Sequence, residues 1–386
     1  MAVAVIGAGV AGVACVWALC RRGIEVIAFD DRAGSSALSS GALDARPVGT
    51  VAPISAELMA FAQGFEAWSL TTDERWIATA AGVIREVRGI DTGLLDLAPL
   101  AGGRIGVADL GVPAFDAETL ARALSAASWA VATRTRFVRV ELDLVAAEAP
   151  SLADFDLARR FEADPPRSEL VRALAGVKDV DGWLVGPWLG TSPHAVASLR
   201  ASLPIPIGEI TSSVGGPAGA RFEAARDRLL SALGTLRVAR RVISVQPRRP
   251  GWEITASGPN GALEQLVADE VVLAIGGVAG GGITVGAGGA LLDRARFGTS
   301  VGLEVDFELD GRNIDRVSSL HGIDVQALGV SALERIGIAH TGGRVRGCDG
   351  IYLAGDVVPG AARTLLGAAQ SGIDAAALVG TARSPA

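Results

Sequence analysis

Three glycines near the N-terminus have the spacing of a phosphate-binding turn. Gly7, Gly9 and Gly12 follow an apolar run at residues 2–6 and open a segment with helical spacing that ends at Gly23. The first glycine of such a turn permits a tight bend, the second lets the backbone approach a pyrophosphate, and the third lets the helix pack on the strand. The N–H groups at the start of the helix, which begins with Val10 and Ala11, would bind the phosphates.

An acidic residue stands where a dinucleotide's ribose would lie. Asp30 ends a second apolar run, "IEVIAFD", 18 residues after Gly12, and its carboxylate could accept hydrogen bonds from the ribose diol. We assign its neighbours Asp31 and Arg32 to the same site. The alternative is a glycine-rich turn that matches by chance. The strand, turn, helix and acidic residue occur together, and this combination favours dinucleotide binding.

A second aspartate follows an apolar run near the C-terminus. Asp356 lies in "GIYLAGDVVPG", residues 350–360, and a helical pattern, "LLGAAQSGIDAAAL", comes soon after it. A buried ionised carboxylate needs a hydrogen-bonding partner. Either Asp356 faces a ligand or it caps the turn that follows.

Two stretches resemble the later signatures of the flavoproteins with two dinucleotide-binding domains. They are "VVLAIGG" at 271–277 and "DGIYLAGD" at 349–356. The resemblance implies that Gly355 and Asp356 lie by the ribityl–phosphate region of a flavin, and that Leu366 and Gly367 lie at the edge of its ring. The helix dipole would stabilise negative charge on the reduced flavin. The site would also include Val242, Ala274 and Gly276.

Five blocks, spread over most of the chain, resemble the FMN-type subunit of anaerobic glycerol-3-phosphate dehydrogenase and its relatives. In that family this flavoprotein passes reducing equivalents towards quinone, together with a larger FAD subunit and a membrane-associated iron–sulfur subunit. The resemblance implies that Ser39, Ser40 and Gly41 form a loop beside the flavin. The blocks are "LSSGALDARPVG", "DLARRFEADP", "IGEITSSVGGPAGARF", "LAIGGVAGGG" and "IYLAGDVVPG".

Departures from that family alter the expected cofactor and substrate. The complete glycine motif, Asp30 and Asp356 favour FAD, with FMN as the alternative. The segment after Asp356 lacks the family's glycine-rich run, so amine, opine or hydroxy-acid oxidation stands beside glycerol 3-phosphate. Residues 36–50 contain no histidine, so we expect the flavin to be bound non-covalently.

The sequence does not identify a catalytic residue. Its three histidines are His194, His321 and His340, and each could be a general base or a surface or core-edge residue. Arg46 and Arg221 could bind a substrate carboxylate or phosphate, or could be paired with acidic neighbours. We keep His194, Arg46 and Arg221 as the candidates.

Composition excludes several classes of protein. The chain has 386 residues, 49% of them hydrophobic, with 50 glycines, which suits packed α/β layers. A net charge of −7 without a basic cluster disfavours nucleic-acid binding. Cys15, Cys20 and Cys348 lack the spacing of a metal site or a disulfide framework. This cysteine usage favours the cytoplasm, with any membrane association made through partner subunits.

The pattern of elements predicts an α/β fold with a discontinuous, Rossmann-like FAD-binding domain. We expect a central parallel sheet with a β-meander from residues 1–55, 222–282 and 339–386, and an inserted α+β domain for substrate or partner from residues 56–221 and 283–338. Helices are expected at 56–68, 117–130 and 220–234, and strands at 136–145, 237–246, 252–258 and 268–277.

Three functions fit these observations. The first is a flavin-binding dehydrogenase subunit that relays reducing equivalents from a small substrate to a partner subunit. The second is a self-sufficient FAD-dependent oxidase or dehydrogenase acting on a small amine or hydroxy acid. The third is a flavin-fold subunit with an assembly role and no catalysis.

Overall fold

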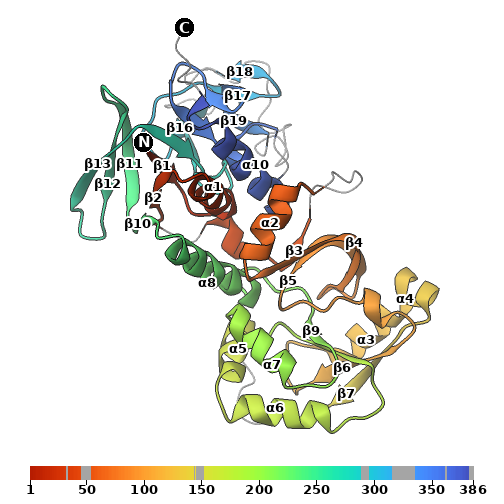
Figure 1. Cartoon of the computed structure of the whole chain (residues 1–386). Helices are drawn as coiled ribbons and strands as arrows, with labels where there is room; N and C mark the ends of the chain where they lie inside the picture. The colour runs from red at the N-terminus through yellow and green to blue at the C-terminus, as the bar shows by residue number, and fades with distance from the viewer. Residues whose placement is uncertain are drawn as a thin grey trace. The chain divides into compact units, whose positions relative to one another are not determined.

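The structure is a computed structural model, and it describes residues 1–31, 34–44, 54–142, 144, 152–287, 295–314, 335–360 and 363–381; in β15 and β16 the side chains of 285–287, 295 and 296 are not described. Residue contacts divide the chain into two compact units. The first unit comprises Met1–Ser36, Ala45–Phe61 and Arg228–Ala386, and the second unit comprises Ala37–Asp44 and Ala62–Asp227. The elements of both are drawn in Figure 1.

The first unit is built on a seven-stranded sheet. Its strand order is β10-β2-β1-β14-β22-β21-β20, and the five strands from β10 to β22 are parallel. The central strands β1 and β14 are almost continuously apolar, as expected of parallel strands covered on both faces. The bounds are β1 Ala2–Ile6, β2 Glu25–Phe29, β10 Leu236–Val238, β14 Glu270–Leu273, β20 His340–Thr341, β21 Arg344–Val345 and β22 Ile351–Leu353.

An antiparallel meander connects two strands of this sheet. Strands β11 Arg241–Pro247, β12 Trp252–Ser257 and β13 Leu263–Ala268 form a three-stranded sheet of their own between β10 and β14. The parallel sheet and the meander confirm the predicted α/β fold class. The first unit's helices are α1 Val10–Arg21, α2 Ala56–Gly64 and α10 Leu365–Leu378, with a 3₁₀ turn, η3, at Gly355–Val357.

The remaining strands of the first unit share its core. Ile283, Phe297, Phe307 and Ile338 belong to the same buried cluster as residues of β1 and β14. The division into units thus keeps these strands with the dinucleotide-type sheet, whereas the sequence analysis assigned 283–338 to the inserted domain. The strands are β15 Ile283–Ala287, β16 Ala295–Thr299, β17 Phe307–Leu309, β18 Arg312–Ile314 and β19 Ile336–Ile338.

The second unit combines a parallel sheet with an antiparallel one. The parallel sheet has the order β7-β6-β8-β9, and helices lie between its strands along the chain. The antiparallel sheet has the order β3-β5-β4. The strand bounds are β3 Ala42–Leu43, β4 Trp68–Ala78, β5 Ile84–Asp91, β6 Arg104–Asp109, β7 Arg136–Glu141, β8 Gly182–Val185 and β9 Ile207–Glu209.

The helices between β6 and β9 pack on these sheets through two buried clusters. Leu157, Phe161, Leu174 and Trp183 lie in one cluster, and Leu97, Leu120 and Leu124 lie in the other. The helices are α3 Ala117–Ala126, α4 Ser128–Thr133, α5 Asp154–Glu162, α6 Pro166–Ala175 and α7 Pro193–Ala201, and the 3₁₀ turn η2 Ala98–Leu100 precedes β6. Helix α8 Pro217–Ala232 and the 3₁₀ turn η1 Ser35–Leu38 each contain residues of both units.

Several expected elements end at different residues. The helix expected at 117–130 is two helices, because Ala127 is extended, with φ −64° and ψ 142°. The strand expected at 237–246 is two strands, because β10 pairs with β2 while β11 pairs with β12. In the part of the chain that the structure describes, no helix is long and apolar enough to cross a membrane.

Candidate dinucleotide-binding site

Two glycines of the N-terminal motif are required by the protein's own packing. Gly7, at the carboxyl end of β1, has φ +103°, and a Cβ atom there would lie 2.3 Å from the carbonyl oxygen of Ala274. A Cβ atom at Gly12 would lie 1.8 Å from the carbonyl oxygen of Gly7. The turn therefore bends at Gly7, and α1 packs closely on it at Gly12, as the sequence pattern indicates.

Gly9 is not required in the same way. Its φ of −67° is open to any residue, and a Cβ atom there would approach only the Ser36 hydroxyl oxygen, at 3.3 Å. Neither backbone conformation nor close packing explains this glycine. The space at Gly9 fits the role of the second glycine in the motif, which allows a pyrophosphate close to the backbone.

The start of α1 presents backbone donors beside Gly9. The N–H of Val10 donates to the hydroxyl oxygen of Ser36 at 3.0 Å, and the N–H of Val13 donates to the carbonyl oxygen of Gly9 at 3.0 Å. Among the described residues, no acceptor is found for the N–H groups of Ala11 and Gly12. Such groups, together with the positive end of the helix dipole, suit an anion.

Asp30 follows the carboxyl end of β2, and its carboxylate is hydrogen-bonded to an arginine of a neighbouring strand. Its side chain is almost buried, and its Oδ2 accepts a hydrogen bond from Nη2 of Arg237 on β10 at 2.5 Å. A carboxylate has about four acceptor positions. A ribose diol would therefore share the Asp30 carboxylate with Arg237. The next predicted residue, Asp31, is exposed.

The second motif lies against the first. Gly355 has φ +75°, and a Cβ atom there would lie 2.7 Å from the Cβ of Ala11 in α1. A hydroxyl of α10 holds this turn, because the N–H of Gly355 donates to Ser371 Oγ at 2.9 Å. The motif after β22 is thus packed on the start of the helix that follows β1.

Asp356 also lies next to the loop that follows β14. Arg363 donates through Nη1 to the backbone carbonyl of Asp356, and the same nitrogen lies 3.6 Å from Asp356 Oδ1. A Cβ atom at Gly277 would lie 2.7 Å from that carbonyl oxygen. Any ribityl hydroxyl on Asp356 would have Arg363 beside it.

Helix α10 begins with a capped turn and crosses α1. Thr364 Oγ1 accepts a hydrogen bond from the N–H of Gly367 at 3.0 Å, and Leu366 is buried. Further along, a Cβ atom at Gly372 would lie 2.0 Å from the carbonyl oxygen of Ala11. The absence of a side chain at Gly372 lets the two helices meet at the first motif.

The structure thus brings together most of the predicted site in the first unit. Gly7, Ala11, Gly12, Ala274 and Gly355 are neighbours. Gly276, with φ +81°, lies in the loop after β14. Val242 is buried in the core and pairs with Ala256 of the meander. Arg32, Arg46 and His321 lie outside the described residues.

The predicted serine loop belongs to the second unit. Ser39 Oγ accepts a hydrogen bond from the N–H of Gly41 at 3.1 Å. The carbonyl oxygens of Ser40 and Gly41 accept from the N–H groups of Ser212, at 2.9 Å, and Asp91, at 2.7 Å. The loop is therefore fixed on the end of β5 and on the segment after β9.

Arg221 is a buried ion-pair residue, and this corrects its assignment as a substrate ligand. It is fully buried, and its nitrogens donate to Asp91 Oδ1 at 2.7 Å, to Glu209 Oε2 at 2.6 Å and to the carbonyl of Gly190 at 2.6 Å. Burial alone would lower the pKa of Arg221, but the two carboxylates outweigh it and raise the pKa. The guanidinium is occupied by the protein.

Glu209 is the fully buried partner in this group. Its Oε1 also accepts a hydrogen bond from the N–H of Leu189 at 2.6 Å. Burial raises the pKa of the Glu209 carboxyl, and the charge and hydrogen bonds of Arg221 oppose that rise. We call Asp91, Glu209 and Arg221 the buried triad.

The two described histidines differ in setting. His194 is exposed in the first turn of α7. His340 Nδ1 accepts a hydrogen bond from the N–H of Gly343 at 3.1 Å, which closes the turn between β20 and β21. Within the described residues no group of three or more His, Cys, Asp or Glu side chains is arranged to hold a metal ion.

Sequence reasoning missed the side chains that support the two motifs. Ser36, Arg237 and Ser371 lie 26, 207 and 16 residues from the residues they contact. Arg363 is nearer, seven residues after Asp356, and no local pattern identifies any of the four. Thr364 could have been found, because a threonine directly before an apolar helical run is an N-cap signal.

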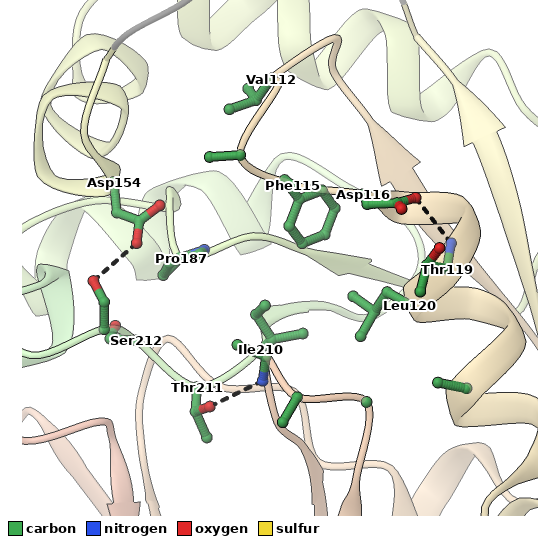
Figure 2. A pocket seen from close by; sticks show the side chains of 16 residues that line it. Val112, Phe115, Asp116, Thr119, Leu120, Asp154, Pro187, Ile210, Thr211 and Ser212 are labelled. Carbon is green, nitrogen blue, oxygen red and sulfur yellow. Dashed lines mark hydrogen bonds between the residues drawn. The ribbon is translucent and has the colours of Figure 1, made fainter.

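The second unit contains a cavity of about 360 Å³ that the sequence did not indicate. It lies within this unit between the start of α3, the β4–β5 turn and the segment after β9 (Figure 2). Its lining residues are Ala80, Ala81, Gly82, Val112, Ala114, Phe115, Asp116, Thr119, Leu120, Ala123, Asp154, Pro187, Ile210, Thr211, Ser212 and Ser213.

Comparison with known proteins gives no family assignment. No family model matches the chain, and no curated protein matches it. Among solved structures, similarity is found to glycine oxidase from Geobacillus kaustophilus, at 15% identity and a TM-score of 0.35, over 98% of this chain and 95% of that one. Iminodiacetate oxidase from a Chelativorans species matches at 15% identity and a TM-score of 0.30, over 98% and 94%.

A third similar structure is that of AlpK. It matches at 12% identity and a TM-score of 0.35, over 96% of this chain, which spans 59% of the length of AlpK. At TM-scores of this size, the likeness by itself establishes neither a shared fold nor a shared activity.

Proposed function

We propose that the chain is an FAD-dependent oxidoreductase whose first unit binds the cofactor non-covalently. The observation that carries the proposal is the contact between the two motifs, where Gly355 lies on Ala11 of α1. A pyrophosphate bound at that contact would have an AMP half towards Asp30 and a ribityl half towards Asp356. FMN has no AMP half, so it would leave the Asp30 end of the site without a ligand.

The residues present fit such a cofactor. The space at Gly9 and the N–H groups of Ala11 and Gly12 suit the pyrophosphate. Asp30 is positioned by Arg237 to accept from a ribose, and Asp356 is positioned by Arg363. A bound flavin supplies the redox chemistry, and the chain's residues hold and orient it.

For the reaction, we propose first a self-sufficient oxidase or dehydrogenase of a small molecule. The second unit has its own cavity of about 360 Å³, which is within the usual size of small-molecule sites, roughly 300–1,000 Å³. In this reading the chain both binds a substrate and passes electrons directly to a soluble acceptor.

A second candidate is a flavoprotein component of a larger complex that relays electrons to a partner. It is favoured by the five sequence blocks that resemble the FMN-type subunit of anaerobic glycerol-3-phosphate dehydrogenase. A larger FAD-containing or iron–sulfur subunit would then accept the electrons, and the chain would be cytoplasmic and peripheral to a membrane through that partner. An assembly role without catalysis is the third reading.

Substitution of Gly9 tests the cofactor proposal. We expect Gly9→Ala to lower FAD content at least tenfold, since the added methyl group would enter the space assigned to the pyrophosphate. Folding should survive, because only Ser36 Oγ lies near that position. The measurements are flavin absorbance after denaturation and the circular dichroism melting temperature.

Gly176→Ala is the matched control. Gly176 has φ −72° at the end of α6, and a Cβ atom there would meet no atom closer than 3.4 Å. It should retain full flavin content. Equal flavin content in the two variants would overturn the assignment of Gly9.

Turnover separates the enzymatic readings. Oxidation of an added substrate by the isolated chain, with an artificial dye as acceptor, is expected for the self-sufficient enzyme. Activity that appears only when partner chains co-purify would favour the relay role. A bound flavin that neither substrate nor partner reduces would favour the assembly role.

A further inference from the structure

The cavity of the second unit has two aspartates in its lining, and one of them, Asp154, is held in place by two side chains. Asp154, in the first turn of α5, accepts a hydrogen bond from Ser213 Oγ at 3.0 Å through Oδ2, and one from Nε1 of the buried Trp188 at 3.3 Å through Oδ1. These two bonds fix the orientation of the carboxylate. Each oxygen keeps an acceptor position for a further donor.

The rest of the lining is apolar or weakly polar. Figure 2 shows Asp154 and Asp116 on opposite sides of Phe115. The Asp116 carboxylate already caps α3 by accepting from the N–H of Thr119 at 2.9 Å. Val112, Leu120 and Ile210 supply aliphatic surface, and the Phe115 ring, which packs edge-on against Trp188 with centroids 4.9 Å apart, supplies an aromatic wall.

The charge of the lining selects the ligand. Of the lining residues that the structure describes, two are aspartates and none is lysine, arginine or histidine. A ligand carboxylate or phosphate would meet no cationic partner and two like charges, which is unfavourable in a partly enclosed site. An organic ammonium ion would pair with Asp154, and its apolar body could contact the aliphatic wall and Phe115.

One wall of the cavity is tied to the serine loop. Ser212 lines the cavity, and its N–H donates to the carbonyl oxygen of Ser40 at 2.9 Å. The sequence resemblance implies that this loop would lie beside a bound flavin. Within the second unit, the cavity and the loop are therefore held together by a direct backbone hydrogen bond.

We propose that this cavity binds a small amine, as an organic ammonium ion with an apolar substituent, and that Asp154 is its anchor. The inference that the cavity is the substrate site of an enzyme rests on the proposed function. It selects amines over the hydroxy acids and phosphates that the sequence left open. The inference that the cavity binds an amine rests on the geometry of the second unit alone.

The test is calorimetric titration of the purified full-length chain with benzylammonium, benzyl alcohol and benzoate. We expect benzylammonium to bind at least tenfold more tightly than the alcohol, and benzoate not to bind. Asp154→Asn should weaken benzylammonium binding at least tenfold, since it removes the charge and keeps a similar shape. Benzoate binding as tightly as benzylammonium would overturn the proposal.

Two further variants guard against loss of folding. Asp156→Asn is the matched control, because Asp156 lies in the same first turn of α5, is exposed and does not line the cavity; it should bind like the unmodified chain. Ala114→Trp fills the cavity from an exposed position and should abolish binding. Equal weakening by Asp154→Asn and Asp156→Asn, or unchanged binding to Ala114→Trp, would contradict the assignment.

Flavin content is measured on the same samples. Absence of flavin with intact benzylammonium binding would contradict the proposed function but would agree with the proposed ligand of the cavity. Flavin present without benzylammonium binding would contradict only the proposal that the cavity binds an amine.

Discussion

At the scale of single residues, identical residue types have different roles that only their surroundings reveal. Gly7 and Gly9 belong to one motif, yet Gly7 is required by its positive φ and close packing, whereas Gly9 has a φ open to any residue and a Cβ atom there would approach only the Ser36 hydroxyl oxygen. Arg221 was ambiguous in the sequence because its partners are distant along the chain. The nearer, Glu209, is itself buried, and Asp91 lies in another strand.

The buried triad predicts a large stability effect. Arg221→Met should lower the free energy of unfolding by about 3–5 kcal/mol, because two buried carboxylates lose their cation. Arg221→Lys should lose less, since it keeps the charge. Urea unfolding followed by circular dichroism measures this.

A surface pair is the control for the triad. Arg85 pairs with Asp44 at 3.0 Å, and both are more than a third exposed; Arg85→Ala should therefore change the free energy by less than about 1 kcal/mol. Arg221→Met with unchanged stability and lost substrate turnover would restore the substrate-binding role.

At the scale of elements, prediction succeeded where one local pattern determines the structure. The strand–turn–helix unit ends as expected, with α1 stopping before Gly23 at φ +71°. Prediction failed where tertiary pairing decides. The expected strand at 237–246 divides because its two halves pair with different sheets. The β9 strand was missed, because three residues ending in a charged Glu209 do not look buried.

The crossing of α1 and α10 is the element contact most sensitive to substitution. Gly372→Ala should lower the free energy of unfolding by about 1–3 kcal/mol, because the added methyl group would collide with the Ala11 carbonyl. Flavin content should fall with it, since Ala11 lies in the first turn of α1, whose N–H groups are assigned to the pyrophosphate. Urea unfolding and flavin absorbance on the same sample check both effects.

Ala377→Leu, at an exposed position of the same helix, is the control and should change stability by less than about 0.5 kcal/mol. Equal stability of the Gly372 and Ala377 variants would show that α1 and α10 can move apart at Gly372 without lowering the free energy of unfolding.

At the scale of the whole molecule, the sequence predicted the α/β class and much of the candidate cofactor site, because that site is built from short motifs at strand ends. It did not predict the parallel sheet of the second unit, whose strands are short and separated by helices. The cavity was also missed, since its lining comes from several separate chain segments between Ala80 and Ser213. No single segment carries a pattern for it.

The central claim is that the chain binds FAD across two adjoining motifs, and identification of the cofactor tests it most directly. The purified chain is denatured, and the released flavin is identified by mass. Reconstitution of the apoprotein with FAD should raise the melting temperature, because a ligand at 100 times its Kd adds about 2.7 kcal/mol to the stability of the folded state. FMN at the same concentration should raise it far less. FAD as the released cofactor is the predicted result; FMN, or no flavin together with no thermal shift by FAD, would contradict the claim.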